Sequence, residues 1–217
     1  MTNDPFHQEL HKTRRIVIIQ AVLVGKAITN AVHDLSQGSS TLAREVIARE
    51  GDLTASQRAI QRCCLDLFAL QTTIARDLRE LVVLERVASE LEQMNQRSVR
   101  IAQQAVRLKY RGQFAMTRTL DVLTYLVCEQ VQEGIWAFAE RNLERARGLP
   151  GRQVAIVAQC RQTSQELLER MTRDASSVAA ASGLLLATNE LEGIGEHIIR
   201  IGEQVIALAS GKIAIRT

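Results

Sequence analysis

The chain has 217 residues and a formal net charge of +3 at neutral pH, and 46% of its residues are hydrophobic but only 3% are aromatic. This length suffices for one sizeable domain or two small ones. The scarcity of aromatic residues argues against stacking-based recognition of single-stranded nucleic acid, and no run of five or six like charges marks a nucleic-acid-binding tail. Ala, Leu, Ile, Val, Arg, Gln and Glu dominate, which is typical of long-helix proteins.

Apolar residues recur at helical spacing from the first helix onward. The two heptad rows of that helix are Val17, Val24 and Ala31, and Ala21, Ile28 and Leu35. The SQGSS stretch at 36–40 predicts the end of the helix, with Ser39 or Ser40 as the N-cap of the next. Later helices are expected to begin near Ile74, Met116, Pro150 and Val178. The YRGQF stretch at 110–114 is the expected central linker.

Neither a membrane span nor an export signal is evident in the sequence. We find no uninterrupted apolar stretch of 18 or more residues, so we expect no transmembrane helix. The polar start, MTNDPFHQELHKTRR, lacks the layout of a signal peptide, so a cytoplasmic location is expected. The cysteines, at positions 63, 64, 128 and 160, lack the C-x-x-C spacing of zinc or redox sites. We expect them to be buried, reduced thiols.

A shift of 100 residues superimposes the chain on itself. The stretch SELEQMNQRSVRIAQQAV at 89–106 then lies over NELEGIGEHIIRIGEQVI at 189–206. Identical pairs include Glu90/Glu190, Leu91/Leu191, Glu92/Glu192, Arg100/Arg200, Ile101/Ile201 and Gln104/Gln204. Long amphipathic helices need neighbours for their apolar seams, and short connections favour antiparallel packing. We therefore predict an all-α fold of two tandem antiparallel three-helix bundles with six long helices, spanning residues 1–110 and 115–217.

The stretch NELEGIGEHIIRI at 189–201 holds two acids one turn apart and two glycines inside a helix. The heptad rows place Glu192 and Glu196 on the side away from the core seam, where they could chelate a cation or, for Glu196, pair with Arg200. The same rows place Gly195 beside the seam, where a neighbouring helix could approach closely, and Gly193 on the outer face. His197, at the seam edge, is expected to be a plain helix-flank residue.

Four stretches carry a recognisable pattern. They are an F-x-x-E-L start formed by Phe6, Glu9 and Leu10, followed by LAREVI at 42–47, CLDLFALQTTIARDLREL at 64–81 and LEGIGEH at 191–197. Together they resemble the PhoU family of phosphate-signalling regulators. The resemblance implies a tandem three-helix fold, no enzymatic activity and a cytoplasmic adaptor role. It further implies negative regulation of phosphate uptake and phosphate-starvation signalling, through contacts with a phosphate ABC transporter ATPase and a sensor histidine kinase.

The resemblance also implies metal sites, because several PhoU proteins hold iron or zinc clusters on acidic motifs of the middle and last helices of each bundle. The corresponding positions here are Glu50 and Thr54 with Glu92 and Gln96, and Pro150 and Val154 with Glu192 and Glu196. About half of the positions lack a carboxylate, so we expect a metal-free protein, with a weak iron or zinc ion as the alternative. Pro150 and Gly51 predict that the middle helices are bent or split.

Three functions remain open from the sequence. The first is the adaptor hypothesis, which places a partner surface at Glu90, Arg97, Arg100, Glu190 and Arg200. The protein would reach the membrane only through its partners, and a homodimer is plausible. The second is an iron- or zinc-binding or sensing protein. The third, nucleic-acid binding, has only the arginine-rich stretch RNLERARGLPGR at 141–152 in its favour, and glutamates interrupt it. No glycine-rich phosphate loop or nucleophile elbow supports an enzyme.

Overall fold

The computed structural model describes residues 5–69, 75–109 and 118–210. The described residues form the helices α1 (Pro5–Gln37), α2 (Thr41–Ala48), α3 (Glu50–Ala69), α4 (Ala75–Lys109), α5 (Arg118–Ala139), α6 (Leu143–Arg173) and α7 (Val178–Ser210), with one 3-10 turn, η1 (Ala175–Ser177), before α7. The expected linker at 110–114 and the expected helix starts at Ile74 and Met116 lie outside the described residues. The start expected at Val178 is confirmed.

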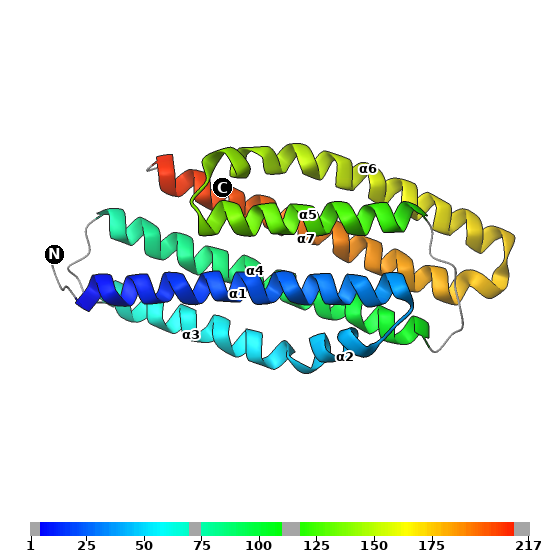
Figure 1. Ribbon diagram of the computed structural model, residues 1–217, viewed down its shortest axis with the longest axis horizontal. Coiled ribbons are helices and arrows are strands. Elements are labelled where there is room, and N and C mark those ends of the chain that lie inside the picture. Colours follow the sequence, from blue (N-terminus) through cyan, green and yellow to red (C-terminus); the bar gives the residue numbers. More distant parts are fainter. Residues whose placement is uncertain (1–4, 70–74, 110–117, 211–217) are drawn as a thin grey trace.

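The helices form two three-helix bundles that lie side by side (Figure 1). Helices α1, α4 and the α2–α3 pair make the first bundle, and α5, α6 and α7 make the second. The bundles join chiefly where α4 packs against α7, and a second contact joins α1 to α5. In both contacts the two helices run in opposite directions (Figure 1). The predicted all-α fold of two tandem three-helix units is therefore confirmed.

The middle helix of the first bundle is split. Helix α2 ends at Ala48, and α3 begins at Glu50. Arg49 between them has a φ of −93° and a ψ of 3°, which depart from regular helix. Gly51, which destabilises a helix interior by about 1 kcal/mol relative to alanine, follows at once. The prediction of a split middle helix is confirmed in this bundle.

In the second bundle the expected helix start at Pro150 is wrong, because α6 begins at Leu143 and continues through the proline. Asn142 caps the helix, and its side chain accepts a hydrogen bond from the Arg145 amide at 3.1 Å. Pro150 is exposed, while Leu149 beside it is fully buried. Packing of the buried face therefore holds the helix together past the missing amide.

A buried carboxylate of α1 shapes the turn into α2. Ser40 occupies the N-cap position but its side chain makes no capping hydrogen bond. Asp34, which is 1% exposed, instead accepts a hydrogen bond from the Ala43 amide at 2.8 Å. Gly38, with a φ of +62°, supplies the left-handed residue that lets the chain reverse.

Both predicted heptad rows of α1 are buried in a core that runs through the two bundles. Each fully buried Val, Leu or Ile contributes about 1.5–3 kcal/mol. By length and composition, α1 is also the one described helix apolar enough to cross a membrane, although its buried rows are core positions of the first bundle. Only 39% of its most apolar 18-residue stretch is buried, so much of an apolar helix faces solvent.

Candidate functional site

Two reciprocal clusters of charged side chains join α4 to α7. Glu190 of α7 accepts hydrogen bonds from Nη1 of Arg97 and from Nε of Arg100, both at 2.8 Å. In the second cluster Glu90 of α4 lies 3.5 Å from Nη1 of Arg200. The two clusters occupy positions related by the 100-residue repeat, so two antiparallel copies of one helix make the same contact twice.

All five residues of the predicted partner surface therefore lie in these clusters between the bundles. The Glu90 and Glu190 side chains are only 23% and 20% exposed, whereas those of Arg100 and Arg200 are 45% and 40% exposed. The carboxylates thus face the helix interface, and parts of the arginines remain open to solvent.

The sequence reasoning missed the role of His197. The residue is 5% exposed, and its Nδ1 lies 2.6 Å from Oε2 of Glu90, a distance at which the ring N–H donates to the carboxylate. It occupies the position that Arg97 occupies in the other cluster. The repeat alignment contained a signal that could have identified this role, because the equivalent positions carry a basic side chain in both copies, Arg97 and His197.

The expected outer-face position of Gly193 is wrong. This glycine is buried against α4, and a Cβ built there would lie 2.3 Å from Cζ of Arg97. The missing side chain therefore gives the guanidinium room to reach Glu190. The heptad rows failed here because they describe one seam, whereas α7 packs against α4, α5 and α6 together.

Gly195 leaves space on another side of α7, next to buried glutamine side chains of α5 and α6. Gln130 of α5 donates from Nε2 to Oε1 of Gln153 of α6 at 2.9 Å and to the Gly195 carbonyl at 3.0 Å. A Cβ at Gly195 would lie 2.1 Å from that same Oε1. Gly202 similarly admits Leu149 of α6. The expectation that small residues beside the seam allow a close approach is confirmed.

The acidic candidates for a metal site do not converge. Glu50 and Glu196 are exposed, Glu92 and Glu192 are half-buried, and Glu196 lies 3.7 Å from Arg200. Within the described ranges, no group of three His, Cys, Asp or Glu side chains is placed to hold a metal ion. The residues present therefore do not fit a multinuclear cluster, which needs several carboxylates to offset its charge.

The cysteines have no disulfide partner and do not extend such a site. Burial, above all, raises the pKa of Cys64 and Cys160 to about 12, and the nearby carboxylate of Glu192 adds to the rise at Cys160. A thiol that stays protonated is a poor metal ligand, because metals bind the thiolate. Cys64 and Cys160 are buried, and Cys63 and Cys128 are partly buried.

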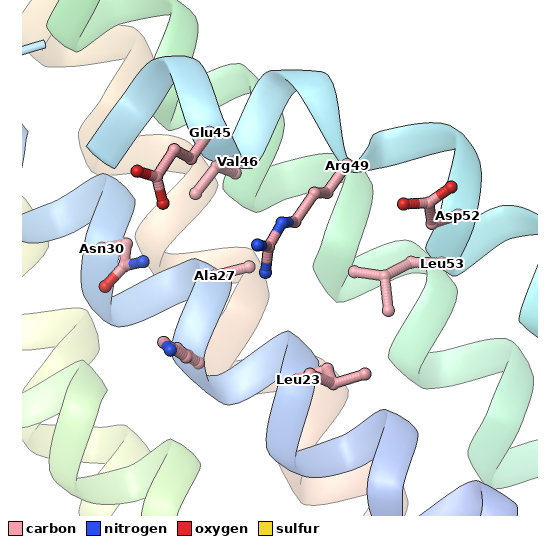
Figure 2. Close-up of a pocket in the computed structure, with 9 residues that line it drawn as sticks. Leu23, Ala27, Asn30, Glu45, Val46, Arg49, Asp52 and Leu53 are labelled. Atoms are coloured by element: carbon pink, nitrogen blue, oxygen red, sulfur yellow. The ribbon is translucent and has the colours of Figure 1, made fainter. Parts of the chain in front are cut away.

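An open cleft of about 360 Å³ lies between α1 and the α2–α3 junction. Figure 2 shows Arg49 reaching from that junction toward Ala27 of α1, with Glu45 nearer one end and Asp52 nearer the other. Lys26 of α1 lines the same cleft. Within the described part of the chain, none of these four charged side chains has a hydrogen bond or an ion pair. The cleft thus combines unpaired charges of both signs with a partly apolar floor.

These features define a two-repeat helical-bundle protein whose repeats are joined by reciprocal ion pairs. The family model described as "PhoU domain" matches residues 19–105 and 121–205, one match in each bundle. The chain belongs to the PhoU family. Because curated members of this family are accessory proteins of phosphate-specific transport systems, the prediction that the chain is not an enzyme is confirmed.

Individual relatives agree with the family assignment over nearly the whole chain. A phosphate-specific transport system accessory protein PhoU homolog of Rhizobium meliloti is 26% identical over 207 residues, covering 95% of this chain and 87% of the relative. The homolog of Clostridium acetobutylicum is 24% identical, covering 98% and 97%. The crystal structure of PhoU from Pseudomonas aeruginosa matches with a TM-score of 0.91 and 25% identity, covering 95% of this chain and all of that one.

Proposed function

We propose that this chain is a cytoplasmic adaptor that keeps the phosphate-starvation response off while phosphate is plentiful. It would do so by contacting the ATPase of a phosphate ABC transporter and a sensor histidine kinase. The observation that carries the proposal is the family match in both bundles, together with relatives whose names place them in phosphate-specific transport systems.

The α4–α7 surface is one candidate contact region for these partners. Arg100 and Arg200 keep part of their charge exposed there. A cleft of about 340 Å³ lies beside the second ion-pair cluster and is lined in part by Glu90, Glu203 and Arg200. Charges of this kind govern the rate and selectivity of association more than its affinity.

Deletion of the gene in the source organism tests the proposal. Without the gene, a phosphate-starvation reporter should become active in medium rich in phosphate, and the wild-type gene supplied in trans should silence it again. Co-purification at high phosphate should recover the transporter ATPase or the kinase. A reporter that stays silent in the deletion strain, with neither protein recovered, would contradict the adaptor function.

We further propose that the protein performs this role without a metal cluster. The dispersed carboxylates support this, because the described residues offer no three-ligand group. Elemental analysis of protein purified without chelators should find less than one equivalent of iron or zinc per chain. Several equivalents, lost in a Glu192→Gln and Glu196→Gln double variant, would instead support the metal-sensing alternative.

A further inference from the structure

Helix α1 carries a second apolar row that the core does not use. Ile16, Ile19 and Leu23 follow each other at spacings of three and four residues, and these residues are 37%, 58% and 44% exposed. Such a row forms a continuous stripe on one helix face. It differs from both buried heptad rows, so α1 has an apolar face left over after the bundle is formed.

This row leads into the cleft of Figure 2. Leu23 is both the last member of the row and a wall of the cleft, whose floor includes Val46 and Leu53, at 5% and 8% exposed. The row and the cleft therefore form one surface, which we name the α1 groove. It is made by the row on α1, the cleft residues Lys26 and Ala27, and the facing side of the α2–α3 junction.

We infer that the α1 groove is the docking site for an amphipathic helix of a partner protein, whose apolar stripe covers the row and whose carboxylate is bound by Lys26 and Arg49. The inference rests on the proposed adaptor function and assigns it a specific surface. Apolar anchors at helical spacing, seated in a groove between helices, are the contacts that helix-in-groove recognition uses. Lys26 and Arg49 can bind a carboxylate of that helix, and Glu45 and Asp52 can bind a cationic side chain of it, because none of these four side chains has a partner among the described residues.

The shape of the groove argues against two other occupants. A flat membrane surface could touch the exposed row but not the recessed Val46 and Leu53. A small ligand could fill the cleft of about 360 Å³ but would leave Ile16 and Ile19 uncovered, since neither lines it. A partner helix covers both parts at once.

The test uses the purified full-length chain and the purified transporter ATPase or kinase cytoplasmic portion from the same organism. Dissociation constants would be measured for the wild type, for a Lys26→Glu and Arg49→Glu double variant, and for Leu23→Lys. Controls are Arg161→Glu and Val154→Lys on α6, both at exposed positions of another helix. We expect both groove variants to bind at least tenfold more weakly and both controls to stay within twofold of the wild type.

Carbodiimide crosslinking of the complex tests the chemistry of the partner. It should join the Lys26 amine to an Asp or Glu in a helix of the partner that has apolar residues three and four positions away. Unchanged affinity of the groove variants, or a Lys26 crosslink only to a loop, would overturn the docking inference alone. Absence of any binding by the wild type would overturn the adaptor function and the docking inference together.

Two further outcomes would replace the partner helix by another occupant. Sedimentation of the wild type, but not of Leu23→Lys, with phosphatidylglycerol vesicles would overturn the inference in favour of a membrane. Conversion of a dimer to a monomer by Leu23→Lys, with unchanged affinity for the ATPase and the kinase, would overturn it in favour of a second copy of this chain.

Discussion

Replacing Gly195 by alanine should destabilise the protein, although alanine is the better helix former by about 1 kcal/mol. A Cβ at this position would lie 2.1 Å from Oε1 of Gln153, so the amide must move and the 2.9 Å hydrogen bond from Gln130 is lost. A buried polar group left without a partner costs about 1–3 kcal/mol. With two such groups affected, the Gln153 oxygen and one N–H of Gln130, and the gain in helix propensity subtracted, we expect a net loss of about 1–5 kcal/mol in the free energy of unfolding.

The matched control is Gly148→Ala in α6, because a Cβ at Gly148 would meet nothing within 4 Å. That variant should gain about 0.5–1 kcal/mol. Urea unfolding followed by far-ultraviolet circular dichroism gives both values by linear extrapolation. In a Gln153→Ala background the collision is gone, so Gly195→Ala should then be neutral or stabilising. The reasoning would be refuted if Gly195→Ala stabilised the wild-type protein as much as Gly148→Ala does.

Asp34→Ala should lower the free energy of unfolding by about 1–2 kcal/mol, because a buried carboxylate that caps α2 is removed; Asp34→Asn keeps an acceptor and should lose less. Glu190→Ala should lower the free energy of unfolding, measured in urea, by about 1–3 kcal/mol, because two arginines of α4 lose their partner. The control Glu196→Ala, at an exposed position, should change this free energy by less than about 0.5 kcal/mol. Iodoacetamide at pH 8 should leave Cys64 and Cys160 unmodified in the folded protein and should modify both in urea. Peptide mass mapping measures the modification, and labelling of these thiols in the folded chain would contradict their burial. Because these thiols bind protons more tightly in the folded state, stability should fall as the pH rises from about 9 to about 12, and a rise over that range would show the sign to be wrong.

The repeat and the heptad rows were sufficient to predict the fold. Local periodicity reports which side of a helix is apolar, and the rows Val17–Val24–Ala31 and Ala21–Ile28–Leu35 are buried as expected. The split of the first middle helix also followed from a local signal, Gly51. The start of α6 did not follow from the local signal at Pro150, because packing of the buried face around Leu149 holds the helix together through the proline.

The candidate site depended on contacts between residues far apart in the chain. The sequence showed Glu90 and Glu190 as equivalent, but only the antiparallel crossing of α4 and α7 makes each carboxylate face an arginine of the other repeat. The sequence also indicated that the two glycines of NELEGIGEHIIRI destabilise their helix. It did not indicate which neighbouring side chain each glycine makes room for.

By itself, then, the sequence determined the helical class, the duplication and the buried rows, because these are properties of one helix and its period. The tertiary structure decided that Gly193 makes room for Arg97, that Gly195 makes room for Gln153, and that the row of α1 ending at Leu23 stays uncovered. The physical reason is that a helix in this protein has several neighbours. Periodicity predicts that a face is apolar, but only the packing of all the helices determines what covers that face.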